Sequence, residues 1–510
     1  MKVLRNNSTV ITLTLITIFY ILMAFFLPLT HDDWEWYSKY GMQMLEERFA
    51  NLNGRYLGNI TEIIAVRYNI VRWSTYVIIC LSLLMVMVRF VGHQVSSIYY
   101  VVAFILMLII PSAIYKQTYG WFAGFYNYVP STVCALFIIW YVTTLLFSSQ
   151  RISPIHHVLF YACCVVGQLF MENITVFHML FLALAVVTYI ILYHKLNVKL
   201  LVGLALSSIG TLIMFSNANY RKIFFEGSDY QNIPQEISFV ETIYKTVTSV
   251  FTQWMFFNQI VIILIIIVLA YLLLNKSAVF QSLKTVKQWS LYIGLAILPL
   301  YYFCIYRQFE LFNYQTIHIV NIVNLLICLI FVVSLGLTIH YSISSQETKF
   351  TIYVLMLTLA LVSLPLVIVS PLGPRNFFTI YGIYVVILLL LVKQLHIKMH
   401  IIRSLVMAVA VILSVVFISV FGYIHYYNSE RVAQLKHDIK AHPKKHSYVM
   451  ERLPFENYMQ HSTPKSRKYQ KYFNLYWDIP ENTHVKHVPF GYKNSKCKHE
   501  KEMLNNSNNQ

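Results

Sequence analysis

The residues best suited to chemistry follow the first long apolar stretch directly, where the chain reads His31-Asp32-Asp33-Trp34. Carboxylates are costly to keep near hydrocarbon, so an adjacent pair at the end of a membrane-length helix is a candidate functional site. Neighbouring side chains point in different directions, so one acid can face a reaction centre while the other orients a helix end. Asp32 and Asp33 are candidates for a general base toward a hydroxyl group, or for ligands of Mg²⁺ or Mn²⁺. Capping of a helix that begins at residue 33 is the structural alternative.

Cationic residues recur near the predicted ends of later apolar stretches, beside Gly, Pro or Asn residues. Guanidinium groups bind phosphate oxygens through two parallel hydrogen bonds, and several of them at one membrane depth would form an anion site. Snorkelling toward lipid headgroups is the alternative for each side chain. The predicted phosphate ligands are Arg375, Arg221, Arg55 and Lys222.

Glu172 lies at the tip of a tight predicted hairpin, with almost no loop to keep its carboxylate in water. An ionisable group so close to hydrocarbon usually faces a cavity or a partner. Glu172 is therefore either a second acid of the site or a marker of the hairpin turn.

Aromatic residues are dense in segment 115–128, between two predicted spans. The aromatic belt of a membrane interface accounts for part of this pattern. The other interpretation is a platform on which the apolar face of a sugar stacks, with Gly120 and Gly124 allowing close approach. The predicted sugar contacts are Trp121, Phe125, Tyr126 and Asn127.

The elements that must position these residues are membrane helices. Of the 510 residues, 58% are hydrophobic and 12% are charged, whereas about 25% are charged in soluble domains. Apolar segments of about 20 residues span a bilayer, and they are helical because lipid cannot satisfy backbone polar groups. The apolar blocks predict an all-α polytopic protein with about thirteen spans, near 9–29, 73–91, 97–114, 129–147, 156–171, 174–193, 199–215, 254–274, 289–305, 317–338, 350–370, 379–393 and 404–424.

Charge is distributed unequally over the predicted loops. With the N-terminus in the cytoplasm, the inner loops carry thirteen basic residues and one acid, Glu347, whereas the outer loops before residue 425 carry eleven basic residues and twelve acids. Basic residues favour the cytoplasmic side, and the scarcity of acids there supports the same orientation. An odd number of spans then places residues 425–510 outside. The net charge of +18 therefore reflects inner-face anchoring and a basic tail, not nucleic-acid binding.

The predicted organisation is a transmembrane domain, residues 1–424, followed by a small hydrophilic tail, 425–510, whose last dozen residues have a composition typical of disorder. The helical spacing of Met44, Leu45, Phe49 and Leu52 predicts an interfacial helix in the first outer loop. A second interfacial segment is expected in 216–253. The predicted outer loops are 31–72, 115–128, 216–253, 306–316 and 371–378.

These features together resemble the GT-C superfamily of polytopic glycosyltransferases, and within it bacterial membrane proteins related to the type II glucosyltransferases of surface-polysaccharide modification. The resemblance covers the membrane region, residues 1–424. It rests on Asp32-Asp33-Trp34, Asn53-Gly54-Arg55, the aromatic segment Gly120–Tyr128, Met171-Glu172-Asn173, Asn219-Tyr220-Arg221 and Gly373-Pro374-Arg375.

The resemblance implies transfer of a sugar from a polyprenyl-phosphate carrier to an acceptor outside the cytoplasm of a bacterial plasma membrane, with Asp33 or Asp32 as the base toward the acceptor hydroxyl. The acceptor class would be a cell-envelope polysaccharide, a teichoic acid or a lipid-linked glycan, and metal dependence stays open. Motifs for nucleotide binding or zinc hydrolysis are missing from the sequence. The alternatives are a polymerase or ligase that uses lipid-pyrophosphate oligosaccharides, and a lipid or glycan transporter.

Overall fold

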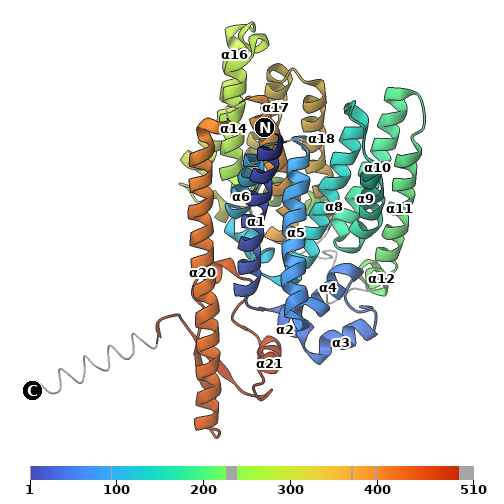
Figure 1. Ribbon diagram of the computed structural model, residues 1–510. Helices are drawn as coiled ribbons and strands as arrows, with labels where there is room; N and C mark the ends of the chain where they lie inside the picture. The colour runs from blue at the N-terminus through green and yellow to red at the C-terminus, as the bar shows by residue number, and fades with distance from the viewer. Residues whose placement is uncertain (1, 93–94, 226–237, 369–371, 397–398, 493–510) are drawn as a thin grey trace, which may run out of the picture.

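The chain forms a bundle of long helices with one small pair of strands in the part that the computed structural model describes, residues 2–92, 95–225, 238–368, 372–396 and 399–492 (Figure 1). The strands β1 (Tyr448–Glu451) and β2 (Val485–Val488) pair in parallel. The prediction of an all-α polytopic membrane protein is confirmed at this level.

Eleven helical stretches among the described residues are long and apolar enough to cross a membrane. Two further predicted spans correspond to shorter apolar helices, α6 (Ile98–Leu108) and α9 (Pro154–Val166). The thirteen predicted positions therefore all hold apolar helices, and the number that cross the bilayer stays a prediction. The long ones are α1 (Lys2–Phe26), α5 (Asn69–Arg89), α8 (Phe122–Phe147), α10 (Glu172–Tyr193), α11 (Val198–Phe215), α14 (Ile260–Lys276), α16 (Thr285–Tyr301), α17 (His318–Ser342), α18 (Gln346–Ser363), α19 (Phe378–Gln394) and α20 (Met399–Ala441).

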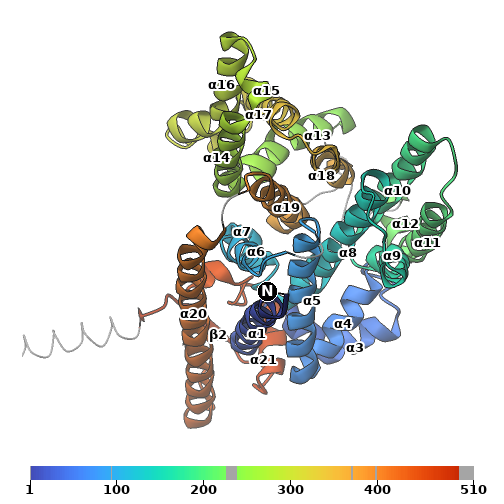
Figure 2. The same cartoon turned by 45° about the horizontal axis from the view of Figure 1, so that its top comes forward.

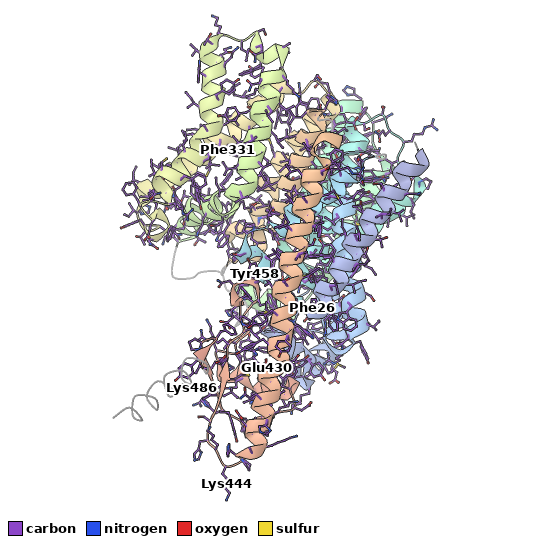
Figure 3. All side chains as sticks on the ribbon, turned by 60° about the vertical axis from the view of Figure 1, so that its left-hand side comes forward. Phe26, Phe331, Glu430, Lys444, Tyr458 and Lys486 are labelled. Carbon is purple, nitrogen blue, oxygen red and sulfur yellow. The ribbon has the colours of Figure 1, made fainter. Side chains whose placement is uncertain are left out.

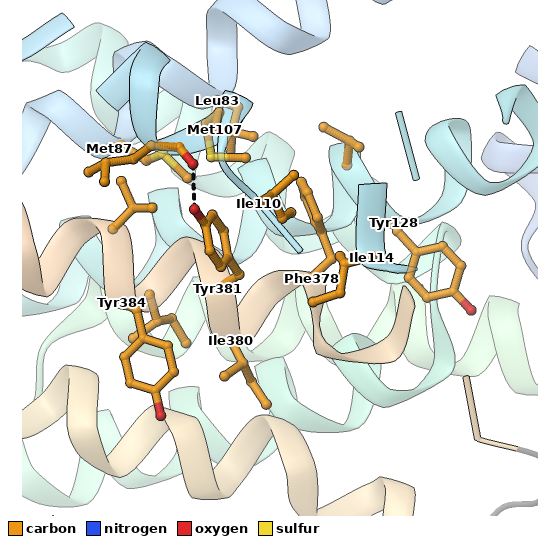
Figure 4. Packing of buried hydrophobic residues seen from close by; sticks show 14 of the residues in the cluster. Leu83, Met87, Met107, Ile110, Ile114, Tyr128, Phe378, Ile380, Tyr381 and Tyr384 are labelled. Atoms are coloured by element: carbon orange, nitrogen blue, oxygen red, sulfur yellow. Dashed lines mark hydrogen bonds between the residues drawn. The ribbon is translucent and has the colours of Figure 1, made fainter. Parts of the chain in front are cut away.

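The bundle is built around α8 and α19, which pack against each other. The apolar parts of these two helices are 83% and 89% buried. Helices α14–α18 gather on one side of α19, helices α9–α12 on the far side of α8, and α1, α5 and α20 form a third group (Figure 2). Figure 4 shows the central packing, where the Tyr381 hydroxyl donates to the carbonyl of Leu106 on α6. Because α8 is held in the core, its N-terminal residues have a fixed position in the structure.

Short helices collect at one end of the bundle, called here the site end, which lies at the bottom of Figure 1. Segment 31–72 contains three short helices, but the predicted helix through Met44, Leu45, Phe49 and Leu52 is only partly formed, because it ends at Glu46 and Phe49 has a left-handed backbone with φ of 57°. In 216–253, two helices and a π-helical segment are described, and residues 226–237 lie outside the described residues. The short elements of the chain are α2 (Asp32–Tyr37), α3 (Lys39–Glu46), α4 (Tyr56–Arg67), α7 (Ser112–Gln117), η1 (Gly167–Leu169), α12 (Ala218–Phe225), α13 (Phe239–Lys245), η2 (Thr246–Phe256), η3 (Phe257–Gln259), α15 (Ala278–Gln281), η4 (Tyr302–Tyr306), η5 (Leu311–Asn313), η6 (Leu364–Ile368), η7 (Pro374–Phe377) and η8 (Glu456–Tyr458).

The predicted outer loop 115–128 is largely helical, which corrects that expectation. α7 ends at Gln117, and α8 begins at Phe122, so only four residues connect the two helices. The aromatic residues after Trp121 continue the apolar face of α8 because they pack into the core instead of lining a loop.

The last long helix runs past the predicted boundary at residue 424 without a break. α20 continues to Ala441, and the chain then returns along it through β1, η8, α21 (Arg467–Tyr476) and β2 (Figure 3). α21 packs on α2, where the rings of Trp34 and Phe473 lie 5.2 Å apart and the Tyr472 hydroxyl donates to Glu35 at 2.8 Å. The tail is therefore a folded unit docked at the site end. The dozen residues expected to be disordered lie outside the described residues.

The docked tail makes Gly120 intolerant of a side chain. A Cβ at this position would lie 2.0 Å from the carbonyl oxygen of Tyr458, closer than any van der Waals contact. We expect Gly120→Ala to displace the tail loop and to accelerate hydrogen–deuterium exchange in residues 455–463. Gly422→Ala is the matched control, since its nearest neighbours are side-chain atoms of Phe26 at 3.8 Å. Equal exchange in both variants would show that the tail is not seated here.

Candidate functional site

Asp32 is the acid of the predicted pair that remains accessible, with 29% of its side chain exposed. Its Oδ1 accepts a hydrogen bond from the Tyr469 hydroxyl of α21 at 2.8 Å. His31 Nδ1 lies 2.8 Å from the same oxygen without the geometry of a hydrogen bond. Burial alone would raise the pKa of Asp32, but His31, Tyr469 and the positive charge of Arg375 outweigh it and lower that pKa. Asp32 is therefore an ionised carboxylate at neutral pH.

Arg375 and Trp121 lie beside Asp32, so the structure brings three predicted site residues together. The Arg375 guanidinium stacks over the ring of Trp121 at 5.3 Å and over Tyr128 at 5.6 Å, as in cation–π pairs. The His31 ring meets the edge of Trp121 at 5.9 Å. We call His31, Asp32, Trp121, Arg375 and Tyr469 the Asp32 cluster. It combines a carboxylate, a cation and the ring of Trp121, which is 4% exposed and lies under the guanidinium.

Asp33 faces the other way and is fully buried. Its Oδ2 accepts from the backbone N–H of Thr30 at 2.9 Å, and its Oδ1 accepts from that of Ala123 at 3.0 Å. Ala123 is in the first turn of α8, so the carboxylate satisfies an otherwise unpaired N–H and complements the helix dipole. The capping alternative therefore applies to Asp33, but the capped helix is α8, ninety residues later in the chain.

Glu62 of α4 is a third acid of this region that the sequence analysis did not select. Its side chain is buried, and neither oxygen has a hydrogen-bond donor among the described residues. Burial is the main cause that raises the pKa of Asp33 to about 6 and the pKa of Glu62 well above its ordinary value. The negative charge of Asp33 raises the pKa of Glu62 further, whereas hydrogen bonds from Thr30, Ala123 and Glu62 oppose the rise at Asp33. A protonated Glu62 can donate to Asp33, so the pair retains one proton. The available signal was an acid on the buried face of α4, next to Ile63.

Arg55 and Glu172 form an ion pair with each other, away from the Asp32 cluster. Arg55 Nε donates to both Glu172 oxygens at 3.0 and 2.9 Å, and its Nη2 lies 2.8 Å from Oε2. The Tyr220 hydroxyl donates to Glu172 at 2.7 Å and accepts from the Gly54 N–H at 3.0 Å. Three motifs from α4, α10 and α12 thus meet in one junction, in which Glu172 satisfies the guanidinium.

The neighbouring cations belong to the same part of the structure. Lys222 Nζ donates to Asn51 Oδ1 at 3.1 Å, which ties α12 to the loop before α4. Arg221 is exposed. Of the four predicted phosphate ligands, the structure places Arg375 in the Asp32 cluster, and the other three lie at the junction of α4 and α12.

Three of the four predicted sugar contacts point into the core. Phe125 is fully buried and stacks on Tyr76 at 4.3 Å. The Tyr126 hydroxyl lies 2.8 Å from Thr75 Oγ1, and Asn127 donates to the carbonyl of Ala123 at 2.7 Å. Trp121 is the one of the predicted four that belongs to the Asp32 cluster, because it precedes the first turn of α8. Its side chain is also buried, with 4% exposed.

The two adjacent acids do not fit a shared cation site. Both Asp33 oxygens accept backbone N–H groups, which leaves Asp32 as the carboxylate that could bind a metal ion. No group of three potential metal-ligating side chains is found among the described residues. A divalent cation would therefore need its further ligands from substrate or water.

No family model matches the chain, and neither a curated protein nor a solved structure is significantly similar to it. The resemblance to GT-C glycosyltransferases therefore stays a prediction.

The buried acid pair predicts a pH-dependent stability. A folded-state pKa above the unfolded value of about 4.3 for Glu destabilises the folded protein as pH rises above that value. Glu62→Gln removes the ionisation and keeps a donor for Asp33. We expect it to raise the Tm, measured in detergent, more at pH 8 than at pH 5. The exposed residue Glu46 of α3 gives the control, Glu46→Gln. An equal shift at both pH values would contradict the raised pKa of Glu62.

The junction of Arg55 and Glu172 predicts a loss of stability for Arg55→Ala. Removal of one partner leaves the other charge part-buried, which destabilises a protein by up to about 3 kcal/mol. We expect a clear fall in Tm, no further fall in the Arg55→Ala/Glu172→Ala double variant, and unchanged binding of phosphate compounds. Lys245→Ala, in an exposed ion pair with Glu241, should change Tm little. Additive losses in the double variant would show that the ion pair does not act as a unit.

Proposed function

We propose that the protein transfers a sugar from a polyprenyl-phosphate carrier to a hydroxyl group of an extracytoplasmic glycan. The observation that carries this proposal is the Asp32 cluster, in which an ionised carboxylate lies within the electrostatic reach of the Arg375 guanidinium at the end of a membrane bundle. A lipid-phosphate donor requires a cation at headgroup depth, and a hydroxyl acceptor requires a base nearby.

The proposed chemistry uses each group once. The acceptor hydroxyl gives its proton to Asp32 while its oxygen attacks the anomeric carbon of the donor sugar. The bond from that carbon to the phosphate oxygen breaks, and the polyprenyl phosphate leaves with the electron pair toward Arg375. Attack opposite the leaving group inverts the anomeric carbon. The ring of Trp121 is 4% exposed and is covered by the Arg375 guanidinium, so its part in this chemistry is to position that cation.

Asp32 is the proposed base in preference to Asp33. The oxygens of Asp33 are occupied by Thr30 and Ala123, and the side chain has no exposed surface. A general base must come within hydrogen-bond distance of the hydroxyl that it deprotonates. Asp33 instead holds the segment that carries Asp32.

A groove within the membrane region supports a lipid-linked donor. It has a volume of about 230 Å³, lies between α1, α6 and α20, and is lined almost entirely by apolar side chains such as Phe19, Phe104 and Val411. α1 ends at Phe26, shortly before Asp32. The proposed occupant is the isoprenyl chain of the donor, whose phosphate would reach the site end of the bundle.

In this proposal the site end faces away from the cytoplasm of a bacterial plasma membrane, as the charge of the predicted loops indicates. The acceptor is a cell-envelope polysaccharide, a teichoic acid or a lipid-linked glycan, because these polymers occupy that compartment. Mg²⁺ or Mn²⁺ has no part in this chemistry, because Asp32, the one accessible carboxylate of the pair, is used as the base.

The experiment is a transfer assay with the full chain in nanodiscs, radiolabelled polyprenyl-phosphate hexoses and envelope glycan. Asp32→Asn should lower kcat by about 10²- to 10⁴-fold at unchanged Tm, because it removes the base. Asp33→Asn is the matched comparison, and it should lower Tm because a buried backbone N–H loses its acceptor. Its folded fraction should keep most of the activity, because the amide oxygen of the substituted side chain still accepts one of the two backbone N–H groups and Asp32 is intact.

Three outcomes would contradict the proposal. Unchanged transfer by Asp32→Asn would exclude Asp32 as the general base. Long chains built from lipid-pyrophosphate oligosaccharides would identify a polymerase or ligase. Movement of an unmodified lipid or glycan across the membrane, without consumption of any donor, would identify a transporter.

A further inference from the structure

Basic side chains outnumber acids around Asp32. Lys116, Arg375 and the rings of His31 and His461 come to this region from four separate segments, and Asp32 is the one acid that faces them among the described residues. Two other acids of the docked tail interface are already engaged. Glu35 pairs with Lys468 and accepts from Tyr472, and Glu456 accepts from Ser462 and Thr463.

The tail loop brings His461 to this place through close packing on α7. Its ring lies 4.7 Å from that of His31. A few residues earlier, the Tyr458 carbonyl packs against Gly120, and the Tyr458 ring meets Tyr115 of α7 at 6.0 Å. His461 itself has a left-handed backbone with φ of 39°. Such strain in a non-glycine residue persists only where surrounding contacts impose it.

α7 also contacts the segment that carries Arg375. Gln117 Oε1 accepts from the Arg375 backbone N–H at 3.4 Å. Lys116 stands in sequence between Tyr115, which contacts the tail, and Gln117, which contacts η7. One short helix thus links a cation of the bundle with a histidine of the tail and adds its own lysine.

The pKa of His461 reflects the basic neighbours of its ring. Burial, followed by the positive charges of His31, Lys116 and Lys465, lowers the pKa of His461 to about 4, against the smaller opposing effect of Asp32. His461 is therefore neutral at pH 6 in the free protein. A bound anion would offset these positive charges and favour the protonated ring.

We propose that Arg375, Lys116 and His461 together bind the phosphodiester group of the lipid-linked sugar donor, so that the tail supplies one side of the donor site. The shared chemistry is a phosphodiester with one negative charge, and its identity as the sugar donor rests on the proposed function. Phospholipid headgroups carry the same group, so the test must separate these two sources.

The probe is citronellyl-phosphoryl-glucose, a short-chain donor analogue, and dihexanoylphosphatidylglycerol is the lipid-headgroup comparison. Binding to the purified full chain in maltoside micelles, which contain no phosphate, is measured by calorimetry at pH 6. Two buffers of different ionisation enthalpy report protons taken up on binding. Neither phosphodiester ionises near this pH, so the uptake comes from the protein.

The wild type should bind the sugar phosphodiester at least about tenfold more tightly than the phosphatidylglycerol, with net proton uptake. His461→Gln should weaken that binding about tenfold, as expected for loss of one charge-assisted hydrogen bond, and should remove most of the uptake. His484→Gln is the matched control in the same tail, where the side chain is exposed. Lys116→Gln should weaken binding by a similar factor. It is the test variant to use if His461→Gln lowers the Tm.

Equal affinity for both lipids would overturn the assignment to the donor, and unchanged affinity in His461→Gln and Lys116→Gln would overturn the site itself. Transfer is measured on the same preparations. Transfer with an unaltered KM for the donor in both variants would overturn this inference and leave the proposed function intact. Binding that depends on His461 in a protein without transfer activity would leave the anion site intact and overturn the proposed function.

Discussion

The carboxylate of Asp33 is the contact on which the geometry of the site depends. It joins the segment after α1 to the first turn of α8 through two backbone N–H groups. α8 is held in the centre of the bundle, so this contact fixes the position of the segment after α1 relative to the core. Asp32 then points toward the tail, and Trp121, two residues before Ala123, lies beside it. A flexible loop could not keep an acid and an aromatic ring in register at a membrane boundary.

The same logic explains why some conspicuous motifs are structural. Lipid offers no partner for a polar group, so charges near the span ends must be satisfied by other parts of the chain. Arg55 and Glu172 meet for this reason, and the Tyr220 hydroxyl completes the junction. From sequence alone each looks like a site residue, because a charged residue beside a membrane span has the same signature whether it binds a ligand or another helix.

Much of the helix pattern was predictable, because long apolar segments have few alternatives in lipid. For Asp32, Trp121 and Arg375, the sequence predicts that all three lie at the same depth in the membrane. It does not predict that they lie next to one another. Glu62 was missed because its character depends on burial against Asp33, a contact between separate elements that no local pattern encodes. The inward direction of Phe125 was likewise set by where α8 begins. If the helix began four residues later, at residue 126, the same ring would belong to the connecting segment.

Three acids close together in space thus have three different states, and the environment decides each. Asp32 is accessible and has cationic neighbours, so it stays ionised. Asp33 is buried with two backbone donors, and Glu62 is buried with none, so one proton is retained between them. Groups whose environments push their pKa values apart can take separate roles in acid–base chemistry. If all three were ionised, their repulsion would oppose the packing of α2 and α4 against α8. The proton on the buried pair therefore limits the three acids to two negative charges, one shared within the buried pair and one on Asp32, which lies where the cations of α7 and η7 and the His461 ring of the tail converge.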